Sequence, residues 1–82
     1  MVYATQGTCS REIHYDIVEE GGKKLVRNVA YVGGCNGNLQ GIGKLVEGME
    51  ISEVIERLQG IRCGYKATSC PDQLAKALAQ EL

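Results

Sequence analysis

The chain has 82 residues, of which 44% are apolar and 23% charged, and its formal net charge is −1. This length predicts a single domain over 1–82 with a small core. The near-neutral charge argues against binding to nucleic acid or to an anionic membrane surface. No apolar run approaches the roughly 20 residues that cross a bilayer. The first residues lack the pattern of a secretory signal, so a cytoplasmic location is expected.

Three segments in the first half of the chain, at 2–6, 11–18 and 25–32, predict β-strands. In the second segment, apolar residues from Ile13 onward alternate with polar ones, as in a half-buried strand. His14 falls on the polar side and is expected at the surface rather than at a ligand site. A polar turn with two glycines separates the second and third segments and predicts a hairpin.

The second half of the chain changes to helical spacing. Apolar residues repeat every three or four positions over 39–49, over 51–59 and from about residue 70 to the end. Gly48 and Gly60 are expected to end the first two helices. Strands followed by helices predict an α+β domain, in which about three helices pack on one face of a three-stranded antiparallel sheet.

Polar residues that can cap the predicted helices precede the first and the last of them: Asn36 or Asn38, and Thr68 or Ser69. Within the first helix, Gly41 and Gly43 each cost about 1 kcal/mol of helix propensity relative to alanine. They predict either close packing against a neighbour or a site that needs access to the backbone.

Four cysteines are the main candidates for chemistry. Cys9 follows the first strand, while Cys35 and Cys70 stand at predicted helix starts, where the helix dipole favours thiolate. Thiolates are the ligands that soft metals prefer. Cys63 lies seven residues before Cys70, and no CxxC pair is present. The alternative is that all four are small buried hydrophobic residues, as free cysteines often are.

A glycine-rich stretch at 33–44 has the composition of a nucleotide-binding loop but not its spacing. Asn38 occupies the position of the first glycine of a phosphate loop, and Leu45 replaces the required serine or threonine. Val46 stands where a dinucleotide-binding loop needs its last glycine. These glycines are therefore expected to be structural.

The pentapeptide Thr68-Ser69-Cys70-Pro71-Asp72 resembles the signature of the small TSCPD-domain proteins. Further blocks carry the same resemblance in the same order: GTCS at 7–10, GGCNGNLQGI at 33–42, LVEG at 45–48 and GIRCG at 60–64. The resemblance implies an accessory role linked to adenosylcobalamin-dependent ribonucleotide reductase, whose C-terminus carries such a domain. The chain is too short for the radical-generating barrel, so it is not expected to reduce a nucleotide alone.

The layout is also similar to iron–sulfur scaffold proteins of the IscU/NifU N-terminal type. In those proteins three cysteines, from a loop, a strand-to-helix junction and a helix start, converge on one metal or cluster. The resemblance implies that Cys9, Cys35 and Cys70 converge here at one end of the sheet. Cys63 has no counterpart in the scaffolds, and a closed site of four cysteines would resemble structural zinc.

Three functional hypotheses follow. The first is a metal- or cluster-binding module, holding zinc or an iron–sulfur cluster through Cys9, Cys35 and Cys70 with Cys63 as a fourth ligand. The second is a thiol-redox or regulatory partner of ribonucleotide reductase without metal, using Cys63 and Cys70 as a dithiol. The third is a structural interaction domain with inert cysteines. Under each, a homodimer would add burial to a core with no Trp or Phe.

Overall fold

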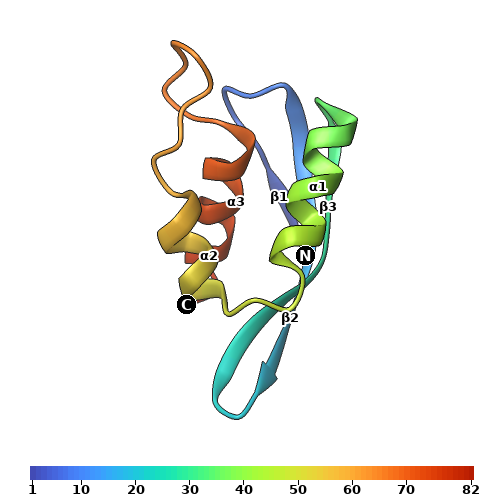
Figure 1. Cartoon of the computed structure of the whole chain (residues 1–82), viewed down its shortest axis with the longest axis vertical. Helices are drawn as coiled ribbons and strands as arrows, with labels where there is room; N and C mark the ends of the chain where they lie inside the picture. The colour runs from blue at the N-terminus through green and yellow to red at the C-terminus, as the bar shows by residue number, and fades with distance from the viewer.

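The computed structural model describes residues 1–82, and its first half forms a three-stranded antiparallel sheet (Figure 1). The strands are β1 (Val2–Ala4), β2 (Ser10–Glu20) and β3 (Lys23–Gly33), in the spatial order β1-β2-β3. Two glycines with positive φ, at 21 and 22, make the β2–β3 hairpin turn. The predicted strands and hairpin are confirmed, although β2 and β3 extend further than the sequence pattern indicated.

Three helices follow the sheet: α1 (Asn36–Val46), α2 (Ile51–Leu58) and α3 (Cys70–Ala79). α1 packs on β3, and α2 packs on α3 (Figure 1). Gly48 and Gly60 lie just beyond the ends of α1 and α2, with φ of +77° and +83°. The α+β class is therefore confirmed. None of these helices has the length and apolar character needed to cross a bilayer.

The core lies between one face of the sheet and the helices. Ile13 and Tyr15 of β2 are buried, while His14 between them stays on the exposed outer face. The largest side chains with less than 2% of their surface accessible come from β2, β3, α2 and α3: Ile13, Ile51, Leu74, Leu78, Val26 and Val54. The alternation of buried and exposed residues along β2 confirms what the sequence pattern predicted for this strand.

Close packing of α1 on β3 depends on one of its two interior glycines. A Cβ placed on Gly43 would lie 2.8 Å from the carbonyl oxygen of Val29, so any side chain there would force the helix away from the strand. A Cβ on Gly41 would meet nothing within 4 Å. The prediction of close approach is therefore confirmed for Gly43 and wrong for Gly41.

The predicted cap of α1 is also wrong. The helix begins at Asn36, earlier than the hydrophobic spacing indicated, and its N-cap is Cys35, whose side chain makes no capping hydrogen bond. Asn36 therefore lies in the first turn, where its Oδ1 accepts a hydrogen bond from Gln40 Nε2 at 3.0 Å.

Candidate functional site

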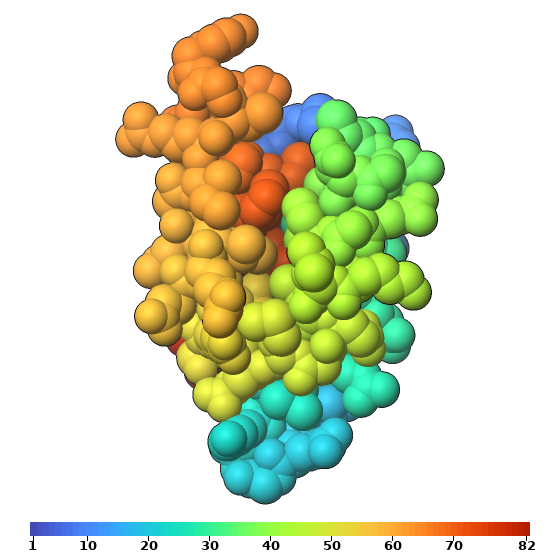
Figure 2. All heavy atoms as spheres, viewed as in Figure 1, coloured from blue at the N-terminus to red at the C-terminus, as the bar shows by residue number.

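All four cysteines line one pocket of about 240 Å³ at the end of the fold where α3 begins. They come from four separate segments: the β1–β2 loop, the β3–α1 junction, the α2–α3 loop and the first residue of α3. Figure 2 shows the start of α3 in orange-red at the bottom of a hollow, between α1 in green and the α2–α3 loop in orange. The remaining wall residues are Thr8, Asn38, Leu39, Ile42, Lys66, Ser69 and Pro71.

Two of the four thiols are in contact. The Sγ atoms of Cys9 and Cys70 lie 3.9 Å apart, although the residues are 61 positions apart in the chain. Cys70 is buried, with 7% of its surface accessible, whereas Cys9, Cys35 and Cys63 are exposed. The pocket thus has a buried thiol at its base and three exposed thiols around it.

Polar groups of the β1–β2 loop surround the Cys70 thiol. Ser10 Oγ lies 3.2 Å from Cys70 Sγ and is itself 3.2 Å from Thr8 Oγ1. Burial opposes ionisation of Cys70, but hydrogen bonds from Ser10, Thr8 and Cys9 outweigh it and lower the pKa of the thiol. The site therefore makes the thiol at its base easier to ionise than an ordinary cysteine.

The spacing of the close pair suits two ligands of one tetrahedral metal ion. With metal–sulfur bonds of about 2.3 Å, two thiolates on one zinc lie about 3.8 Å apart. The 3.9 Å between Cys9 and Cys70 matches this value. No group of three or more His, Cys, Asp or Glu side chains is arranged to hold a metal ion, so Cys35 and Cys63 would have to turn inward to complete a site.

Cys70 is placed by a network around the start of α3. Ser69 caps the helix: its Oγ accepts a hydrogen bond from Asp72 N at 3.1 Å and donates one to the carbonyl of Ile61 at 2.7 Å. The Asp72 carboxylate accepts hydrogen bonds from Gly60 N at 2.7 Å and from Thr68 Oγ1, and pairs with Lys76. Of the two caps that the sequence predicted, Thr68 and Ser69, the structure has Ser69, whereas the role of Asp72 was not predicted.

Burial also opposes ionisation of Asp72. Its hydrogen bonds with Thr68, Gly60 and Lys76 outweigh that effect and lower the pKa of the carboxyl. Three residues of the signature pentapeptide, Thr68, Ser69 and Asp72, therefore serve to anchor the helix start, and the cysteine between them faces the pocket.

Two further residues that sequence reasoning missed hold the loop of Cys9 and the helix of Cys70 together. Gln73, which is buried, accepts a hydrogen bond from Gln6 N at 3.1 Å and donates one to Thr68 Oγ1 at 2.9 Å. Tyr31 donates a hydrogen bond from its hydroxyl to the carbonyl of Cys70 at 3.0 Å. Burial raises the pKa of Tyr31, so it remains a donor. Gln73 directly follows the signature pentapeptide, but nothing in the sequence indicates the contacts that Gln73 and Tyr31 make.

His14 takes no part in this site. Its Nε2 lies 2.9 Å from Glu12 Oε1 on the exposed face of the sheet, as expected for a surface residue.

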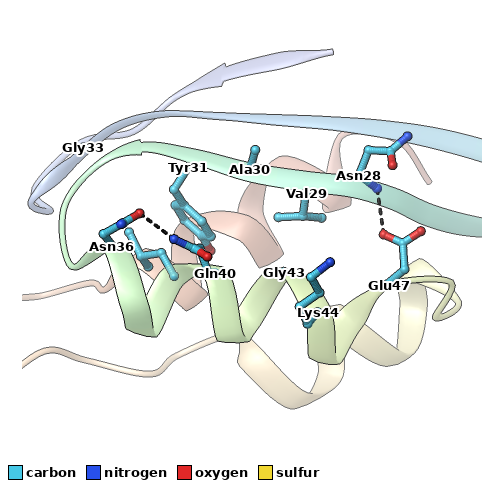
Figure 3. A pocket seen from close by; sticks show the side chains of 11 residues that line it. Asn28, Val29, Ala30, Tyr31, Gly33, Asn36, Gln40, Gly43, Lys44 and Glu47 are labelled. Atoms are coloured by element: carbon cyan, nitrogen blue, oxygen red, sulfur yellow. Dashed lines mark hydrogen bonds between the residues drawn. The ribbon is translucent and has the colours of Figure 1, made fainter.

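A second pocket, of about 230 Å³, lies between β3 and α1 (Figure 3). Amide and charged side chains dominate it: Glu47 accepts a hydrogen bond from Asn28 N at 2.8 Å, and Lys44 lies alongside. It contains no cysteine or histidine, and Gly43 at its floor serves the contact of α1 with β3. Packing therefore accounts for Gly43 of the glycine-rich stretch but not for Gly41.

Comparison with known proteins identifies the family. A search of curated proteins and a search of solved structures found no match. The resemblance to IscU/NifU scaffolds therefore stays a prediction. A family model described as the TSCPD domain matches residues 1–82, the whole chain. The chain therefore belongs to the TSCPD domain family.

Proposed function

We propose that this protein binds a thiophilic metal, as a zinc ion or an iron–sulfur cluster, in the pocket lined by its four cysteines. The observation that carries the proposal is the convergence of four thiols from four separate segments on one pocket. Cys9 and Cys70 would be the first two ligands, and Cys35 and Cys63 would complete the set.

The donor chemistry of the pocket favours a soft metal. Its wall offers four thiols but no carboxylate, and carboxylates are the main ligands of magnesium and calcium in proteins. Hydrogen bonds lower the pKa of the Cys70 thiol, and the thiolate is the form that coordinates metals. Zinc would cross-link the four segments, and an iron–sulfur cluster could in addition carry electrons.

The positions of the other thiols are compatible with this role. Cys35 and Cys63 are exposed, so their side chains can turn toward the pocket without opening the core. Burial of Cys70 argues against a protein disulfide as its reaction partner, because a bulky substrate cannot reach that sulfur. A metal ion is small enough to do so.

Metal analysis of purified protein tests the proposal. Protein prepared anaerobically should contain zinc or iron in a fixed ratio to the chain, and Cys9→Ser and Cys70→Ser should each remove most of it. Ser52→Ala, on the exposed side of α2, is the matched control and should retain the metal. Failure of zinc, and of ferrous iron with sulfide, to bind the reduced wild-type protein would contradict the proposal.

The contact between Cys9 and Cys70 favours a second candidate, a dithiol that serves ribonucleotide reductase, to which the family resemblance points. The structure places Cys9, rather than the expected Cys63, against Cys70. Cys9, the exposed thiol of the pair, would attack a disulfide of the reductase, passing its proton to the reductase sulfur that leaves as a thiol and forming a mixed disulfide. Cys70 would then attack Cys9 Sγ, closing an intramolecular disulfide and releasing the second thiol. Two electrons and two protons pass to the reductase.

Thiol titration separates this candidate from metal binding. A redox dithiol requires a Cys9–Cys70 disulfide that forms and reopens reversibly, and a reductase disulfide that the reduced protein opens. Mass spectrometry of the oxidised protein that finds no such bond would exclude the second candidate.

A further inference from the structure

We infer that the α2–α3 loop over 60–67 closes over the bound metal, with Cys63 as its ligand and Lys66 as its counter-charge. This inference rests on the proposed metal binding and extends it, because it assigns a role to a lysine and predicts a change in the loop. The loop projects beyond the rest of the fold (Figures 1 and 2), and two of its residues, Cys63 and Lys66, line the cysteine pocket.

The loop is held at its base by two side chains of the α3 start, and Cys63 N also donates a backbone hydrogen bond across the loop to the Thr68 carbonyl at 3.2 Å. Gly60 N is bound by the Asp72 carboxylate, and the Ile61 carbonyl by Ser69 Oγ. Beyond these anchors the residues are exposed, and Tyr65 is fully so. Gly64, with φ +60°, provides a flexible position beside Cys63. Movement of the tip would break the hydrogen bond from Cys63 N to the Thr68 carbonyl but leave the anchors at Gly60 and Ile61, and with them the start of α3, in place.

Attraction between Lys66 and the charge of the metal–thiolate centre would favour closure of the loop. Lys66 is the one charged residue on the wall of the cysteine pocket, and it makes no ion pair with any carboxylate. Several thiolates around a divalent metal carry a net negative charge, which the uncharged side chains of the wall cannot balance. Lys66 stands on the same loop as Cys63 and is joined to it by a hydrogen bond from Lys66 N to the Cys63 carbonyl at 3.1 Å. Ligation by Cys63 would thus bring the ammonium toward the anionic centre.

Limited proteolysis with trypsin tests the closure. In metal-free protein the exposed bonds after Arg62 and Lys66 should be cut readily, and zinc should slow both cuts about tenfold or more because local opening is suppressed. Cuts after Lys23 and Lys24 in the β2–β3 hairpin are the internal control and should keep their rate. Cys63→Ser should bind zinc through the remaining thiols but lose the protection.

Lys66 is tested by affinity. Lys66→Met should weaken zinc binding about tenfold at low salt, as expected for loss of one nearby charge, whereas Lys66→Arg should bind as the wild type does. Lys44→Met, which removes an exposed lysine from the other pocket, is the matched control and should leave affinity unchanged. Competition with a chromophoric chelator measures all four proteins.

The outcomes distinguish failure of the proposed metal binding from failure of the proposed loop closure. If wild-type protein binds no zinc, the proposed metal binding fails for this ion and the closure with it. If it binds zinc but cutting after Arg62 is not slowed, or Lys66→Met and Lys44→Met behave alike, the closure is wrong and the metal site stands.

Discussion

Cys70 is the one buried cysteine of the chain, and yet the pKa of its thiol is lower than usual because Ser10, Thr8 and Cys9 donate to it. Since the pKa is lower in the folded than in the unfolded state, ionised Cys70 stabilises the fold fully above the unfolded value. This contribution is lost as the pH falls through the folded-state value. Ionisation of the Cys70 sulfur therefore affects both the stability of the fold and the reactivity of the thiol.

We predict that Ser10→Ala raises the pKa of Cys70, because the nearest donor to its sulfur is removed. The pH profile of Cys70 alkylation by iodoacetamide, followed by peptide mass spectrometry, should shift to higher pH. Ser52→Ala, on α2, is the control and should leave the profile in place. An unmoved profile in Ser10→Ala would show that the loop does not set the ionisation of Cys70.

Asp72, like Cys70, has a pKa that its hydrogen bonds in the folded state lower. Asp72→Asn keeps the size of the side chain but removes the charge from hydrogen bonds to Gly60 and Thr68, so we expect a loss of about 2–3 kcal/mol in the free energy of unfolding. Because the pKa of Asp72 is lowered, its contribution in the wild type should vanish as the pH falls through that folded-state value.

Urea denaturation at neutral and at acidic pH measures the effect of Asp72→Asn. The difference between wild type and variant should be largest at neutral pH and should shrink in acid. Glu56→Gln, an exposed acid on α2, is the matched control and should change stability little at either pH. A difference that stays constant with pH would mean that the charge of Asp72 is not what matters.

At the level of elements, the two glycines inside α1 allow a direct comparison. Gly43→Ala should destabilise the fold by about 1–3 kcal/mol, because its Cβ would collide with the Val29 carbonyl and the gain in helix propensity cannot compensate. Gly41→Ala faces open space and should stabilise the protein by up to about 1 kcal/mol. Chemical denaturation of both variants measures the change in the free energy of unfolding, which should have opposite signs. Equal changes in the two variants would contradict the packing of α1 on β3.

Local patterns in the sequence were enough to predict the strands, the helices and the hairpin, because alternation and helical spacing are properties of neighbouring residues. They could not predict the bulge in β3. There, Asn28 takes φ +59°, and its side chain donates to Asp16 on β2. Nor could they predict the contact of Cys9 with Cys70, which depends on Gln73 joining two distant segments. Tertiary contacts of this kind leave no periodic trace in one sequence.

The molecule as a whole has a small core. Eighteen of its 82 residues are buried, and the core cluster contains one aromatic residue, Tyr15. The four cysteines lie at the end of the fold where the loops meet, away from the hairpin. A metal at that end would join segments that the core itself does not hold together, so we expect binding and stability to be strongly linked.

We therefore predict that zinc raises the melting temperature of the reduced protein. A ligand at a hundredfold excess over its dissociation constant stabilises the folded state by about 2.7 kcal/mol, which corresponds to roughly 10–20 °C for a domain of this size. Differential scanning calorimetry with zinc and with a chelator measures the shift. The Cys9→Ser/Cys70→Ser double variant should melt at one temperature in both conditions, because the pair that anchors the metal is gone. A shift of equal size in the variant would place the metal elsewhere on the chain.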